Sequence, residues 1–147
     1  MSTRFLMNRN RRHRKGSAIM EFALCMPMVF LLLFGTADFG RLYYTAIEVQ
    51  NAAAAGASYG SLSSSNMTDT AGITAAAQND APDISGLQVA VSQVCKRSDG
   101  DVVSCSTSGT IYQYVSVTAS YTFQTFFKYP YIPQSVTLSK TVMMRGA

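Results

Sequence analysis

The order of apolar and polar residues divides the chain into three zones. Residues 1–15 are polar and basic without periodicity, residues 22–37 carry no charge, and from residue 38 apolar and polar positions recur at regular steps. About twenty helical residues, each rising about 1.5 Å, cross a bilayer. Residues 17–37 are therefore predicted to form a transmembrane helix, which Pro27 kinks but does not end.

Residues 38–60 are predicted to continue as an amphipathic stem helix. Apolar and small residues recur there at steps of three and four, which is the helical period: Phe39, Leu42, Ala46, Val49, Ala53 and Gly56 or Ala57. Polar residues lie opposite this stripe: Arg41, Thr45, Glu48 and Asn51. The alanines at 52–55 favour helix and let another layer approach closely. Residues 17–59 would span about 65 Å as one unbroken helix.

Residues 61–147 are predicted to form a small α+β domain. Residues 60–66 have the composition of a loop, and Thr68 or Asp69 offers an N-cap for a short helix that ends at Asp80, before Pro82. Three segments alternate like half-buried strands, namely residues 87–91, 114–123 and 136–142. The predicted fold is a lollipop in which the long helix carries a three-stranded antiparallel sheet.

The positive charge is concentrated at the amino end. Six of the twelve Lys and Arg residues lie within residues 1–15, and the remainder of the chain has a net charge of −2. The sequence pI of about 9.1 therefore does not indicate a nucleic-acid partner. Because a segment rich in Lys and Arg stays on the cytoplasmic side of a membrane, we expect the amino terminus inside and the domain exported.

An ordinary secretory signal peptide is an alternative interpretation of the amino-terminal zone. A cleavage site could be sought at Gly35-Thr36-Ala37, which would release a secreted soluble domain. Glu21 inside the apolar region and the uninterrupted helical pattern that follows both argue against this alternative.

The residues needed for catalysis are scarce. His13 is the only histidine and precedes the apolar zone, so the exported part lacks the commonest general base and metal ligand. Two exported cysteines without a histidine do not make a zinc site, and there is no glycine-rich phosphate loop. We therefore predict a non-enzymatic protein without a cofactor or bound metal. Asp99-Gly100-Asp101 could form a calcium corner, but the pattern favours a tight turn.

Glu21 is the residue that the predicted fold does not explain. A carboxylate in the middle of a bilayer costs roughly 2.5–3.5 kcal/mol on lenient insertion scales. One interpretation is that Glu21 lies at the headgroup level and reaches water. The other is that it has a functional partner.

The residues around Glu21 resemble a known family. Basic residues, Gly16, Ser17-Ala18-Ile19-Met20-Glu21-Phe22, the apolar run and Asp38-Phe39-Gly40-Arg41 resemble TadE-like pseudopilins of tight-adherence pilus systems, and the similarity covers residues 11–59. The family usually has alanine where this chain has Ser17. The resemblance implies that a prepilin peptidase cuts a leader, residues 1–16, between Gly16 and Ser17. It also implies that Glu21 and Phe22 admit the subunit to the filament in register, with Glu21 neutralising the new amine of Ser17.

The resemblance further implies a structural role as a minor pilin that helps to start, cap or complete a pilus used in adhesion. The expected partners are other pilin and pseudopilin subunits, an inner-membrane assembly platform and membrane lipid. The expected location is the bacterial inner membrane as a single-pass protein, with incorporation into an extracellular pilus left open. The alternative function is an unprocessed anchored protein whose outer domain binds an envelope partner.

The three cysteines fall into two groups. Cys25 lies in the apolar helix and is expected to stay unpaired, whereas Cys95 and Cys105 lie in the exported part, where disulfides persist. Both exported cysteines are five residues from Gly100. A three-residue hairpin loop at Asp99-Gly100-Asp101 would place them directly opposite one another, within disulfide range. Two buried free thiols are the alternative.

Aromatic residues are dense between Phe123 and Tyr131. The simplest interpretation is that these side chains pack over the end of the sheet. The alternative is a contact surface for neighbouring subunits, where Tyr and Phe are enriched.

Overall fold

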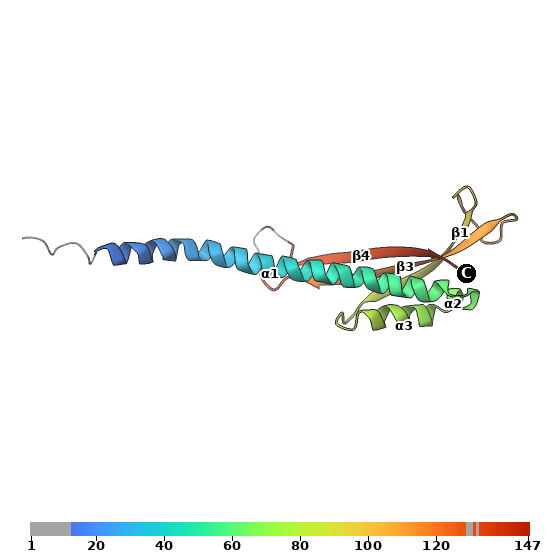
Figure 1. The fold of residues 1–147 in the computed structure, drawn as a ribbon, viewed down its shortest axis with the longest axis horizontal. Coiled ribbons are helices and arrows are strands. Elements are labelled where there is room, and N and C mark those ends of the chain that lie inside the picture. Colours follow the sequence, from blue (N-terminus) through green and yellow to red (C-terminus); the bar gives the residue numbers. More distant parts are fainter. Residues whose placement is uncertain (1–12, 129–130, 132) are drawn as a thin grey trace, which may run out of the picture. The chain divides into compact units, whose positions relative to one another are not determined.

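The computed structural model describes residues 13–128, 131 and 133–147 (Figure 1). Most of the predicted leader, residues 1–12, lies outside the described residues. The chain comprises two compact units, Met1–Phe39 and Gly40–Ala147. Its long amino-terminal helix followed by an antiparallel sheet confirms the predicted α+β class.

Helix α1 runs from His13 to Ser61 as one 49-residue element. It begins four residues before the predicted start at Ser17, and Pro27 lies inside it without ending it. In the first unit nearly all of its apolar side chains are exposed. Within the described residues, α1 is the one helix that is long and apolar enough to cross a membrane.

Two short helices follow α1, where one helix was predicted. Helix α2 (Ser64–Thr68) is capped by Ser63, whose side chain accepts a hydrogen bond from the backbone N–H of Asn66. The predicted loop at residues 60–66 is therefore too long. Only Leu62 and Ser63 lie between the two helices, because α1 continues to Ser61 and Ser63 caps α2. Helix α3 (Thr70–Asp80) has Asp69 at its N-cap, one of the two residues predicted for that position.

The sheet has four antiparallel strands in the order β2-β1-β3-β4 (Figure 1). They are β1 (Gln88–Arg97), β2 (Val102–Val103), β3 (Ile111–Gln124) and β4 (Ser135–Arg145). The predicted count of three strands is wrong because β2 was not foreseen, and β1 extends to Arg97 instead of ending at Val91. Ten residue pairs between β1 and β3 account for this greater length.

The hairpin between β1 and β2 contains the predicted disulfide in a different register. Cys95 and Cys105 are bonded, with their Cα atoms 5.2 Å apart, but the residue opposite Cys95 is Val103. The backbone N–H of Arg97 donates to the carbonyl of Asp101 at 2.9 Å, so residues 98–100 form the loop. Gly100 is the third residue of this loop and has φ +95°. A three-residue loop needs a left-handed residue at that place, and the predicted register put Gly100 in the middle.

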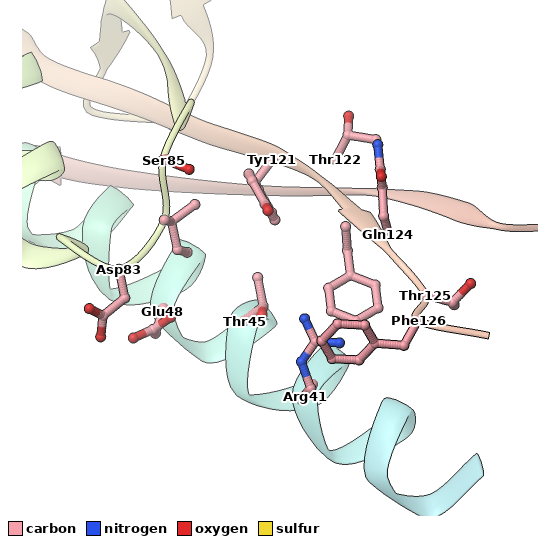
Figure 2. A pocket seen from close by; sticks show the side chains of 12 residues that line it. Arg41, Thr45, Glu48, Asp83, Ser85, Tyr121, Thr122, Gln124, Thr125 and Phe126 are labelled. Atoms are coloured by element: carbon pink, nitrogen blue, oxygen red, sulfur yellow. The ribbon is translucent and has the colours of Figure 1, made fainter. Parts of the chain in front are cut away.

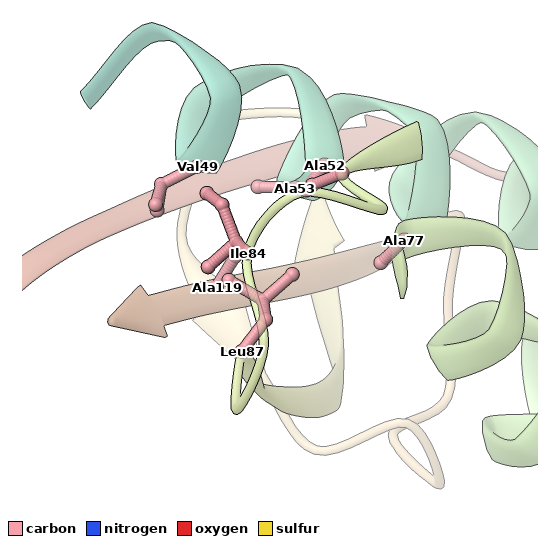
Figure 3. Packing of buried hydrophobic residues seen from close by; sticks show 8 residues of the cluster. Val49, Ala52, Ala53, Ala77, Ile84, Leu87 and Ala119 are labelled. Carbon is pink, nitrogen blue, oxygen red and sulfur yellow. The ribbon is translucent and has the colours of Figure 1, made fainter. Parts of the chain in front are cut away.

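The core lies between α1, α3 and the inner face of the sheet. One cluster joins Val49, Ala52 and Ala53 of α1 to Ala77 and Ala119, with Ile84 and Leu87 closing it (Figure 3). A second cluster packs Ala57 and Ile73 against Val115 and Val117. The alternation predicted for residues 115–123 is confirmed, because their inner-face side chains are buried or partly buried.

Small residues allow this close packing. A Cβ atom on Gly56 would lie 3.2 Å from the Ile73 carbonyl oxygen and 3.2 Å from a Val117 methyl carbon. The apolar stripe predicted on α1 is fully buried only from Val49 onward. Phe39, the first predicted member, is 72% exposed, because burial requires a covering layer as well as an apolar face.

Candidate assembly segment and the cleft beside Arg41

The candidate processing and assembly residues lie together near the amino end of α1. Gly16, Ser17, Glu21 and Phe22 are all exposed and helical. Ser17 and Glu21 are four residues apart, so their side chains lie on one face, with Cβ atoms about 5–6 Å apart. A Cβ atom on Gly16 would meet no atom within 4 Å, so its backbone is accessible from the side.

Glu21 lies among apolar side chains. Ile19, Met20, Phe22 and Leu24 are all exposed around it. Within the described part of the chain, the Glu21 carboxylate makes no hydrogen bond and no ion pair. An apolar environment penalises such a charge unless an opposite charge approaches it. The Glu21 carboxylate is therefore suited to pair with a cation.

The apolar segment that follows Glu21 presents a continuous exposed surface. Phe30 and Phe34 stack with their ring centroids 5.9 Å apart, and the hydroxyl of Thr36 donates to the carbonyl of Leu32 at 2.7 Å. That hydrogen bond satisfies the Thr36 hydroxyl proton within the helix itself. Cys25 is a free thiol, as predicted, and lies on the outside of the helix.

A cleft of about 610 Å³ lies in the second unit, between α1, the end of β3 and the loop before β1 (Figure 2). At one end, the guanidinium carbon of Arg41 lies 3.8 Å from the ring centroid of Phe126 and 5.3 Å from that of Phe123. Glu48 and Asp83 line the other end. Their carboxylates and the Arg41 cation give the cleft opposite charges at its two ends.

Tyr44 lies one helical turn before Glu48 on α1. Its hydroxyl hydrogen-bonds to Glu48, and that bond together with the Glu48 charge raises the pKa of Tyr44 above its ordinary value. The more distant Asp83 charge acts in the same direction. The phenol is therefore held neutral and donates to the carboxylate.

The aromatic connection after β3 differs from its simplest predicted interpretation. Phe123 packs over the sheet and is 3% exposed, but Phe126 is 73% exposed and Phe127 is 46% exposed. Packing against the sheet requires an inward position in the strand, and β3 ends at Gln124. The contact of Arg41 with Phe126 was not foreseen. Arg41 belonged to a motif that carries the resemblance, but spacing alone did not connect it to a residue 85 positions later.

A comparison with known protein families finds a match that includes the candidate assembly residues. The family of TadE-like proteins matches residues 16–58. The chain carries a TadE-like segment. This match confirms, over residues 16–58, the resemblance predicted from the sequence. No curated protein and no solved structure matches the chain.

The TadE-like segment covers less than a third of the chain. It includes Gly16, Ser17, Glu21 and Phe22, together with Arg41 and the part of α1 that packs under the sheet. The disulfide, the four strands and the aromatic connection lie outside it.

Proposed function

We propose that the protein is a minor pilin or pseudopilin of a tight-adherence pilus. A prepilin peptidase removes residues 1–16, and the mature chain begins at Ser17. The mature protein then starts, caps or completes the pilus together with other pilin subunits at an inner-membrane assembly platform. The TadE-like match over residues 16–58 supports this structural, non-enzymatic role.

Glu21 is the observation that carries the proposal. Its carboxylate is exposed, lies in the apolar part of α1 and makes no ion pair within the described residues. Cleavage after Gly16 creates a cationic amine on Ser17, one helical turn away. That amine can neutralise Glu21 in the same helix or in an adjacent subunit, which removes most of the cost of keeping either charge in an apolar bundle.

Two further observations support an exported domain. The basic residues that precede Gly16 favour a cytoplasmic amino terminus. The disulfide between Cys95 and Cys105 fits an oxidising compartment on the other side of the membrane. Helix α1 then crosses the membrane once, with residues 40–147 exported.

Replacement of Glu21 tests the proposal. Glu21→Gln and Glu21→Leu should leave membrane insertion intact, because each makes the helix more apolar, but should abolish or strongly reduce pilus assembly. Insertion is followed by alkaline extraction of membranes, and assembly by counting pili in electron micrographs. Met20→Leu, an exchange at an exposed neighbouring position, is the matched control and should assemble normally. Normal piliation in Glu21→Leu would refute the assigned role of Glu21.

The cleft beside Arg41 favours a second candidate function. In that case the protein is an unprocessed single-pass anchor, and its outer domain holds an envelope partner by this cleft. This candidate predicts that the Glu21 variants behave like the parent chain, whereas Glu48→Gln loses the partner.

A further inference from the structure

The segment after β3 exposes apolar side chains beside two cations. Phe126 is 73% exposed, Phe127 is 46% exposed and Lys128 is exposed. The Arg41 guanidinium lies against the ring of Phe126, at 3.8 Å from its centroid (Figure 2). We call these four residues, Arg41, Phe126, Phe127 and Lys128, the aromatic face.

The contact with Arg41 fixes where the aromatic face lies along the chain. Arg41 is four residues beyond Ala37, where the apolar run ends. Four residues rise about 6 Å in a helix and span at most about 14 Å when fully extended. The headgroup layer on each side of a bilayer is about 5–8 Å thick. The aromatic face therefore lies within reach of the headgroups of any bilayer that residues 17–37 cross.

The chemistry of the aromatic face fits that layer. Aromatic rings concentrate where a membrane meets water, and cationic side chains there are attracted to anionic lipid headgroups. Arg41 and Lys128 supply two cations, while the acidic residues of the cleft, Glu48 and Asp83, line its other end. Arg41 and Phe126 thus share the end of the cleft nearest the apolar segment in sequence, and Phe127 and Lys128 follow Phe126 directly in the chain.

We propose that the aromatic face inserts into the headgroup layer of the bilayer that α1 crosses, on the side of residues 40–147. Phe126 and Phe127 enter the layer, and Arg41 and Lys128 bind anionic lipid phosphates. This contact holds the sheet-bearing unit against the membrane before the subunit is extracted into a filament. The inference rests on the membrane-spanning part of the proposed function. It assigns the aromatic face to lipid and not to a neighbouring subunit.

The chain contains no tryptophan, so a single introduced tryptophan reports its own surroundings. We would place one at Phe127, one at Phe30 in the apolar segment and one at Leu62, an exposed residue directly after the end of α1. Each full-length variant is reconstituted at one chain per nanodisc of phosphatidylethanolamine and phosphatidylglycerol. Acyl chains brominated near the headgroup or near the methyl end then quench the tryptophan according to its depth.

Phe127→Trp should emit at shorter wavelength than Leu62→Trp and be quenched mainly by bromine near the headgroup, whereas Phe30→Trp should be quenched mainly by deep bromine. Deep quenching of Phe30→Trp with no quenching of Phe127→Trp would overturn this inference and leave the membrane span intact. Absence of quenching at Phe30 would overturn both. A blue shift of Phe127→Trp that needs several chains per disc would assign the aromatic face to a neighbouring subunit and also overturn it.

A charge variant gives an independent check on the same reporter. Lys128→Gln in the Phe127→Trp background should weaken the headgroup quenching, and so should replacing phosphatidylglycerol by phosphatidylcholine. Quenching that is insensitive to both changes would remove the role assigned to the cations.

Discussion

At the residue scale, Asp69 joins α1 to α3 by two hydrogen bonds. One oxygen of its carboxylate accepts from the backbone N–H of Gly72 at 2.9 Å, and the other accepts from the Tyr59 hydroxyl at 3.1 Å. The first bond caps α3, and the second holds that cap against α1. The cap was predictable from the sequence because it is local, whereas the bond from Tyr59 depends on the turn between the two helices.

Gly72 leaves no room for a larger residue at this junction. A Cβ atom there would lie 2.6 Å from the Tyr59 hydroxyl oxygen and would also clash with the Asp69 carboxylate. Gly72→Ala should therefore lower the free energy of unfolding by about 1–3 kcal/mol, as overpacking does. Gly40→Ala is the matched control, because its Cβ meets nothing within 4 Å, and it should be neutral or stabilising. Denaturant titration of both full-length variants measures the difference.

The Tyr59 bond predicts a loss of stability in alkaline solution. Its hydrogen bond to Asp69, together with the charge of that carboxylate, raises the pKa of Tyr59 above its ordinary value. A raised pKa means that the fold favours the neutral phenol. Its contribution is complete below the unfolded pKa of about 10 and is lost as the pH rises through the folded value. The midpoint of denaturant unfolding is measured at about pH 8 and at about pH 10.5. The drop in midpoint between these two pH values should be smaller in Tyr59→Phe than in the parent chain.

At the element scale, α1 is a close-packing surface in its second half. Gly56→Leu should destabilise the second unit by about 1–3 kcal/mol or more, because its side chain would force Ile73 and Val117 away. Ser58→Leu adds the same side chain on the exposed side of the same helix and should change stability little. Equal effects of the two substitutions on thermal unfolding would contradict the packing described here.

The hairpin of β1 and β2 depends on its disulfide. Closing a loop of this size contributes roughly 2–3 kcal/mol in the chain-entropy treatment, so the double variant Cys95→Ala, Cys105→Ala should be destabilised by about that amount. Alkylation of the unfolded, non-reduced chain should label Cys25 alone, and reduction should add the other two cysteines. Labelling of Cys95 or Cys105 without reductant would show that the bond is not formed.

The sequence predicts the elements that are determined by neighbouring residues, and it fails for those that depend on pairing with distant parts of the chain. Strand β3 was predictable because Val115, Val117 and Ala119 alternate strictly with polar residues. The last part of β1 was not, since the apolar phase changes at Val94 and pairing with β3 sets its length. Helix α2 was missed because a run of serines resembles a loop, although Ser63 is a good N-cap.

At the scale of the whole molecule, the TadE-like segment carries a linear sequence motif, whereas the cleft beside the sheet is formed by residues that meet only in the fold. The candidate assembly residues were predictable because Gly16 and Glu21 form a linear motif. The cleft was not, because Arg41 and Phe126 come from elements far apart in the chain and meet only in the fold. The proposed assembly residues thus form a local motif, while the surface proposed to meet lipid or a partner is tertiary.

In the proposed processing, the peptidase must reach the backbone at Gly16. Gly16→Ala should therefore be cleaved nearly as well as the parent chain, whereas Gly16→Leu should accumulate as precursor. Immunoblots of membranes from cells that carry the whole pilus system distinguish the two forms by size. Equal processing of the two variants would mean that Gly16 is not the recognised residue.

The most direct test is the amino terminus of the protein itself. The chain is purified from membranes of cells with the whole pilus system, and its intact mass and amino-terminal sequence are determined. Our account predicts a mass corresponding to residues 17–147 with the disulfide intact and a sequence that begins Ser17-Ala18-Ile19. Recovery of the full-length chain, or of a chain that begins after Ala37, would contradict it.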